Sequence, residues 1–81
     1  MVINDYLADA FLQQKNYDKA REYYYVSFQL KQGYYSAYHP SLIRNYEFMA
    51  NWSLEQKEFN KAVENYQQAI EIQLENMPSN H

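Results

Sequence analysis

The 81-residue chain has no cysteine, a single glycine and only two prolines. Without cysteine it can form neither a disulfide nor a thiolate metal site, which suits a reducing compartment, and the cytoplasm is the expected location. Scarce glycine and proline leave few residues that break helices. Because Gln, Glu, Lys, Ala and Leu are abundant, we expect helices joined by short turns, and therefore an all-α fold.

An excess of positive charge is also missing, since seven Lys and Arg oppose ten Asp and Glu, for a net charge of −3. No basic stripe is available for nucleic-acid phosphates or for an acidic membrane, so we expect neither partner. No apolar run is long enough to span a bilayer, and the start of the chain lacks the basic and then apolar pattern of a signal peptide. A chain of this length buries only a small core, so marginal stability is expected.

The chain resembles itself when it is shifted by 42 positions, which pairs Ala8 with Ala50. Similar pairs, such as Tyr6 with Phe48, keep size and polarity. The other identical pairs are Leu12/Leu54, Gln14/Gln56, Lys15/Lys57, Lys19/Lys61, Ala20/Ala62, Glu22/Glu64, Tyr24/Tyr66 and His39/His81. A register of this kind lets stacked units present the same surface to each neighbour. We therefore expect two repeats, residues 1–38 and 39–81.

Apolar residues recur at spacings of three and four within each repeat, which predicts helices at about 2–15, 18–35, 40–57 and 60–77. Polar turns separate them at 15–18 and 57–60, and residues 36–39 link the repeats. Pro40 suits the first position of a helix, and Pro78 closes the last one. Ser79–His81 repeat the approach to a further helix, so we expect a fragment of a longer array.

Small and aromatic residues recur at matching places in the two repeats. The two sets are Ala8, Tyr17, Ala20, Tyr24 and Ser27, and Ala50, Phe59, Ala62, Tyr66 and Ala69. This pattern resembles the tetratricopeptide repeat, and the longer period with a His39-Pro40 turn resembles kinesin light chain repeats. The resemblance implies two tandem helix-turn-helix hairpins, with four antiparallel helices in a short right-handed α-solenoid. Alanine would let paired helices approach, and the aromatic rings would fill the space beside that contact.

The resemblance also implies a concave groove, lined by the first helix of each repeat, that holds a peptide or a partner helix. Carried onto this chain, the groove residues are Val2, Asp5, Tyr6, Asp9, Gln13, Arg44, Glu47, Phe48, Asn51 and Glu55. Kinesin light chain repeats carry an Asn-Asn pair where this chain has Asp5-Tyr6 and Glu47-Phe48. Asp5 and Glu47 would repel a terminal carboxylate, so a basic or neutral peptide is the expected partner.

Tyrosine is concentrated in the first half of the chain, where eight of the ten lie at or before Tyr38. Tyrosine is favoured at interfaces, so some could form an exposed patch. The alternative is that the rings only cover their own helix or pack on a neighbouring repeat. Two repeats leave a large end face, through which copies could self-associate. That face is assigned to Tyr34, Tyr35, Tyr66, Ile70 and Leu74.

Catalytic chemistry is not expected. His39 and His81 occupy equivalent turns, where capping a helix start is preferred to binding a metal. Trp52 is interpreted as packing. The carboxylates on the helices are interpreted as solvated charges, because no nucleophile, oxyanion donor or phosphate loop accompanies them. Two hypotheses remain, a non-catalytic protein-binding scaffold or adaptor without cofactor or metal, and a structural spacer or self-associating unit without a separate ligand.

Overall fold

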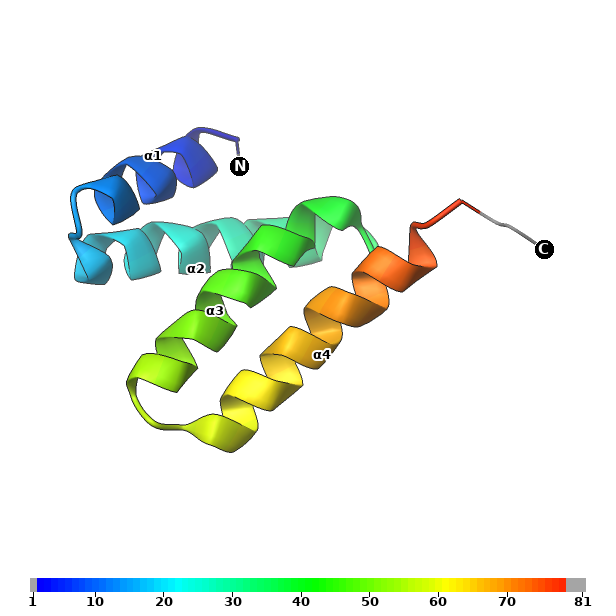
Figure 1. Ribbon diagram of the computed structural model, residues 1–81. Helices are drawn as coiled ribbons and strands as arrows, with labels where there is room; N and C mark the ends of the chain where they lie inside the picture. The colour runs from blue at the N-terminus through cyan, green and yellow to red at the C-terminus, as the bar shows by residue number, and fades with distance from the viewer. Residues whose placement is uncertain (1, 79–81) are drawn as a thin grey trace. The chain divides into compact units, whose positions relative to one another are not determined.

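The computed structural model of the protein describes residues 2–78, and helices are the only regular secondary structure in that range. The helices are α1 (Val2–Gln13), α2 (Tyr17–Tyr34), α3 (Ile43–Glu55) and α4 (Phe59–Glu75), and the short 3₁₀ helix η1 (Pro40–Leu42) leads into α3 (Figure 1). The all-α prediction is confirmed. Each predicted helix is present, and its ends agree with the prediction to within a few residues. The expected approach to a further helix, Ser79–His81, lies outside the described residues.

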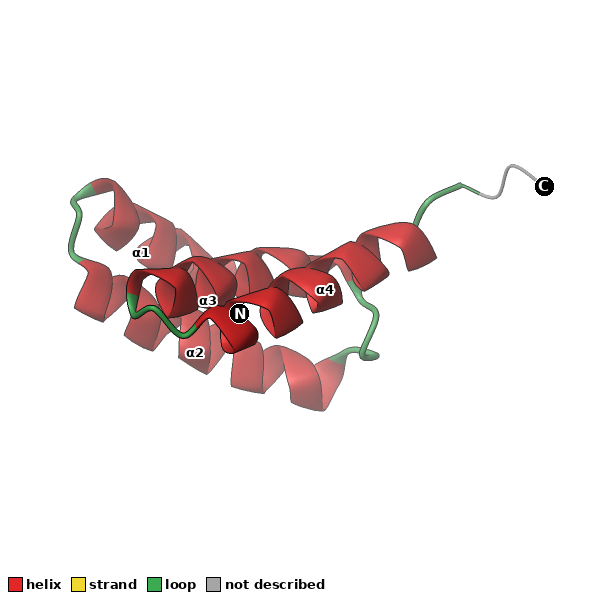
Figure 2. Ribbon diagram, turned by 60° about the horizontal axis from the view of Figure 1, so that its bottom comes forward, coloured by secondary structure: helices red, strands yellow, loops and turns green. Residues whose placement is uncertain are grey.

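The chain forms two compact units that divide between Tyr34 and Tyr35. Unit 1 is the hairpin of α1 and α2, and unit 2 is the hairpin of α3 and α4 together with η1 (Figure 2). Each helix of a pair packs on the other along its length. The boundary predicted between residues 38 and 39 follows the sequence repeat, and it stays a prediction.

Both hairpins turn in the same way. Lys15 and Lys57 each have φ 61°, in the left-handed region. The amide of Lys15 donates to the Leu12 carbonyl at 2.9 Å, and the next amide, of Asn16, donates to the Phe11 carbonyl at 2.8 Å. Lys57 and the residue after it make the equivalent bonds at 3.0 and 2.8 Å. This is the Schellman motif, in which glycine is the usual residue because it has no Cβ. Lysine therefore holds a strained position in each repeat.

The core of unit 1 depends on small residues between the paired helices. Ala8 and Ala20 have no exposed surface, which allows α1 and α2 to approach closely. Phe11 of α1 stacks on Tyr23 of α2 with ring centroids 5.5 Å apart. The predicted filling of this space by Tyr17 is wrong, because that side chain is 50% exposed. Tyr17 is the first residue of α2, directly after the turn.

Unit 2 buries a larger set of side chains. The residues with 4% exposure or less are Leu42, Asn45, Ala50, Ala62, Ala69 and Ile72. Phe59 opens α4 as Tyr17 opens α2, and it is likewise exposed, so the packing prediction is wrong for it too. Among residues 2–78, no helix combines the length and the apolar character needed to cross a bilayer.

The start of the second repeat is fixed by its turn, as the sequence predicts. His39 caps η1, because its Nδ1 accepts the Ser41 amide at 3.1 Å and lies 2.8 Å from the Ser41 hydroxyl. Pro40 follows at the first helical position, where a missing N–H costs nothing. At the other end, the Asn76 side chain donates to the Tyr38 carbonyl at 2.7 Å and to the Ile72 carbonyl at 2.8 Å. These bonds tie the segment before η1 to the end of α4.

Candidate functional site

The predicted groove residues of unit 1 lie on α1, where they differ in exposure. Tyr6 is 67% exposed and Gln13 is also exposed, whereas Asp5 and Asp9 are half-buried. The side chain of Val2 lies outside the described part of the chain. Tyr6 and Gln13 are therefore exposed to a partner, and both aspartates also make contacts inside the hairpin.

Asp5 is the centre of a buried polar cluster between α1 and α2. One carboxylate oxygen lies 2.8 Å from the Lys31 ammonium, and the other accepts the Ser27 hydroxyl at 2.5 Å. The Lys31 side chain is 3% exposed and that of Asp5 is 17% exposed. A pair so far from water is held by its mutual attraction and by the extra hydrogen bond. Lys31 therefore neutralises the charge that Asp5 was expected to bring to the groove.

A tyrosine hydroxyl holds one predicted groove residue in each hairpin. In unit 1 the Tyr24 hydroxyl donates to Oδ1 of Asp9, and in unit 2 the Tyr66 hydroxyl donates to Oδ1 of Asn51. The two bonds are one repeat apart. Oδ1 of Asn51 accepts this bond, and the NH₂ group of the same carboxamide can only donate. The repeat thus presents a carboxylate on α1 and an amide donor on α3.

The predicted groove residues of unit 2 lie on α3. Arg44, Glu47, Asn51 and Glu55 are all exposed, and their spacing of three and four places them on one face. Phe48 is 9% exposed and stacks on Trp52, with ring centroids 6.4 Å apart. Phe48 is therefore part of the core of unit 2, and Trp52 packs against it, as the sequence predicts.

The residues assigned to a self-association face are spread over both units. Tyr34 ends α2 and is 79% exposed. The Tyr35 ring stacks on His39, with ring centroids 3.7 Å apart. The Tyr66 hydroxyl is bonded to Asn51, so both tyrosines already have partners within unit 2. Ile70 and Leu74 are more than half exposed on α4. Of the assigned residues in unit 2, these two expose the most apolar surface.

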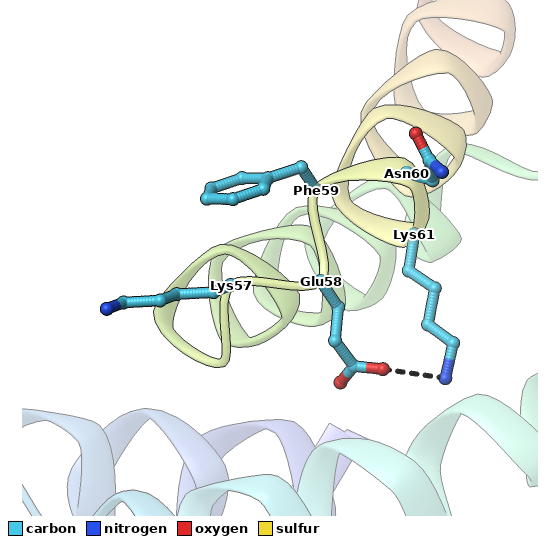
Figure 3. Close-up of a pocket in the computed structure, with 5 residues that line it drawn as sticks. All are labelled: Lys57, Glu58, Phe59, Asn60 and Lys61. Carbon is cyan, nitrogen blue, oxygen red and sulfur yellow. Dashed lines mark ion pairs between the residues drawn. The ribbon is translucent and has the colours of Figure 1, made fainter.

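Metal-binding geometry does not emerge within residues 2–78. No group of three or more His, Asp or Glu side chains there could hold a metal ion. A shallow hollow at the α3–α4 turn is lined by Lys57–Lys61 (Figure 3). In it the Lys61 ammonium pairs with Glu58 at 2.9 Å, and this hydrogen bond and charge raise the pKa of Lys61. Such a lysine stays protonated, so it is unsuited to act as a base.

Sequence reasoning missed the cluster of Asp5, Ser27 and Lys31 and the two tyrosine bonds. A signal for the cluster exists, because Tyr24, Ser27 and Lys31 follow one another at spacings of three and four on α2. This stripe faces Asp5 and Asp9 on α1, which are four residues apart. A lysine in an otherwise packed stripe, opposite a carboxylate, is the mark of a buried ion pair.

Comparison with known proteins gives a family match. A model of the family described as "Tetratricopeptide repeat" matches residues 1–75, which is nearly the whole chain. Searches of curated proteins and of solved structures returned no match. The family match covers both hairpins and all four α-helices.

Proposed function

The chain belongs to the tetratricopeptide repeat family, and from this premise we propose that it is a non-catalytic module that binds a peptide or a partner helix. Helical repeats of this class act through extended surfaces formed by successive units. The binding residues proposed are Tyr6, Asp9 and Gln13 on α1, and Arg44, Glu47, Asn51 and Glu55 on α3. The expected setting is the cytoplasm.

The observation that carries this proposal is the repeated tyrosine bond. Tyr24 orients the half-buried Asp9, and Tyr66 orients the exposed Asn51. A side chain that is already fixed loses less entropy when a partner binds it. Fixing the same position in both repeats supports a role in binding.

A closer kinship to kinesin-light-chain-like repeats is part of the proposal. The 42-residue shift that pairs His39 with His81 supports it, as does the cap that His39 makes ahead of Pro40. The partner is proposed to differ from a kinesin cargo peptide, because Asp5-Tyr6 and Glu47-Phe48 replace the asparagine pair.

A basic or neutral peptide is the proposed ligand class. On α3, Glu47 and Glu55 outnumber Arg44, and on α1 the half-buried Asp9 adds a third carboxylate. With Asp5 neutralised by Lys31, the preference for basic peptides rests on these three acids. It should therefore weaken as salt is added.

Self-association is the second candidate function. Tyr34, Ile70 and Leu74 expose 79%, 52% and 62% of their surfaces, which is high for large apolar side chains. Light scattering over a concentration series decides between the candidates, because a mass that rises with concentration favours self-association.

The binding proposal is tested with labelled peptides of basic, neutral and acidic sequence, by fluorescence anisotropy. Asn51→Ala should weaken the tightest peptide by about 1 kcal/mol, or roughly fivefold, for one lost hydrogen bond. Tyr66→Phe should have a smaller effect in the same direction, since it only releases Asn51. The control is Gln68→Ala, which removes an exposed amide from α4. If the control variant and Asn51→Ala bind alike, Asn51 does not contact the peptide.

A further inference from the structure

Unit 1 encloses an ion pair that unit 2 lacks. Asp5 lies 2.8 Å from the Lys31 ammonium and accepts the Ser27 hydroxyl at 2.5 Å. The Lys31 side chain is 3% exposed. One repeat later, the equivalent residues of unit 2 are Glu47, Ala69 and Gln73. Glu47 and Gln73 are both exposed, so the second repeat leaves these two positions open to solvent.

Several contacts between the paired helices are common to both units. Alanines at equivalent positions are buried in each, and the tyrosine bonds to Asp9 and Asn51 recur. Both turns also hold a lysine in the left-handed region. The hairpin of unit 2 packs without an ion pair, and apolar side chains of similar volume often stabilise a core as well as a buried pair does. The pair in unit 1 therefore calls for an explanation other than packing.

Lys31 takes the position that a basic side chain of a ligand would take. A carboxylate on a binding surface attracts the ammonium or guanidinium group of a partner. This attraction is lost when a cation of the protein itself is already paired with the carboxylate. Both oxygens of Asp5 have partners inside the hairpin, and 17% of its side chain is exposed. The Asp5 position is therefore occupied from within, by Lys31.

Glu47 stands at the same position of the second repeat without such a partner. Within the part of the chain that the structure describes, its side chain makes no hydrogen bond and no ion pair. Gln73 stands where unit 1 has Lys31, and a neutral amide cannot compensate the charge of a carboxylate. The charge of Glu47 is therefore available to a ligand, whereas that of Asp5 is not.

We propose that Lys31 is a specificity-determining residue of the binding surface. Its ammonium closes the Asp5 position of the first repeat to basic side chains of the ligand, so a basic residue is recognised at Glu47, the equivalent position of the second repeat. This inference rests on the proposed function and adds where on the surface the basic residue binds. The segment of the ligand on α1 then meets the exposed Tyr6 and Gln13, which suit uncharged side chains.

Each repeat can be given the residue of the other, with the labelled basic and neutral peptides as probes in fluorescence anisotropy. Lys31→Gln should strengthen binding of the basic peptide about tenfold, as expected for one added hydrogen bond between charged groups, and leave the neutral peptide unchanged. Gln73→Lys should weaken the basic peptide by a similar factor, because its ammonium can pair with Glu47 as Lys31 pairs with Asp5. The matched control is Gln68→Lys, which adds the same charge at an exposed position about 140° around α4 from Gln73. The control should change the affinity less than about twofold.

A small cation tests the Asp5 position without any peptide. Lys31→Ala removes the part of the side chain beyond Cβ, which corresponds to n-propylammonium. This ion should fill the vacated space beside Asp5, so its chloride should raise the urea midpoint of Lys31→Ala more than sodium chloride does at equal concentration. Gln73→Ala, at the exposed equivalent position, is the control and should respond to both salts alike. Circular dichroism checks that each variant keeps its helices, and Gln73→Lys alters an exposed side chain, so the peptide test does not depend on the folding of a Lys31 variant.

The outcomes separate this inference from the proposed function. Opposite shifts of the basic-to-neutral affinity ratio in Lys31→Gln and Gln73→Lys support it. If peptides bind through Asn51 and neither exchange moves that ratio beyond the Gln68→Lys control, the inference is overturned and the proposed function stands. If no peptide depends on Asn51 but the ratio still follows the two exchanges, the role of Asn51 is overturned and that of Lys31 stands. An equal response of Lys31→Ala and Gln73→Ala to n-propylammonium would overturn the inference, whether or not any peptide binds.

Discussion

Replacing the lysine at each hairpin turn with glycine should stabilise the protein. Lys15 and Lys57 have φ 61°, where a Cβ atom crowds the neighbouring carbonyl and costs about 1–2 kcal/mol. Glycine removes that cost, but it loses about 0.5–1 kcal/mol more backbone entropy on folding. The lysine charge at the helix C-terminus contributes a few tenths of a kcal/mol, which glycine gives up. The net gain expected for Lys57→Gly is about 0.5 kcal/mol.

Lys57→Ala is the control that isolates the backbone term. It removes the same charge and keeps the Cβ, so the glycine variant should exceed the alanine variant by about 1 kcal/mol. For a domain of this size, 1 kcal/mol corresponds to a difference in Tm of about 4–8 °C. Urea unfolding followed by circular dichroism gives the free energy directly, and equal m-values would show that the compactness of the two states is unchanged.

The two repeats provide an internal check on the same reasoning. Lys15→Gly against Lys15→Ala should give a difference similar to that at Lys57, because the φ angle and both turn hydrogen bonds recur. Equal stability of the glycine and alanine variants at both turns would refute the argument. It would mean that the turns relax out of the left-handed region when lysine is absent.

Two further predictions concern titratable groups. Lys31→Met leaves the Asp5 carboxylate without its cation and should destabilise the protein by about 2–4 kcal/mol in urea unfolding. The control is Gln73→Met, at the exposed equivalent position, which should change stability by less than about 0.5 kcal/mol. Similar losses for both variants would refute the ion-pair argument. Burial raises the pKa of Tyr46, so the folded protein holds this proton to higher pH than the unfolded chain. The stability from Tyr46 is therefore fully present below its ordinary pKa of about 10 and is lost as pH rises through the raised value, so the urea midpoint should fall less steeply above about pH 9.5 in Tyr46→Phe than in the unchanged protein.

Equivalent positions in the two repeats reveal where sequence reasoning stops. Tyr6 and Phe48 are one repeat apart and have the same pattern around them, yet they are 67% and 9% exposed. Asp5 and Glu47 are also equivalent, but only Asp5 meets a lysine. The groove assignment from the family pattern treated both members of each pair alike. Periodicity assigns a residue to a helix face, and it does not state which side chains from a distant helix lie against that face.

The sequence by itself determined the helices, their approximate ends and the twofold repeat. These features depend on contacts between residues close in the chain, such as the helical spacing of apolar residues and the His39 cap ahead of Pro40. Only the tertiary structure decided that Lys31 is buried beside Asp5, that Tyr66 fixes Asn51, and that Ile70 and Leu74 stay exposed. Those outcomes depend on which side chains come into contact between paired helices, because these contacts determine which groups are buried and which charges are paired.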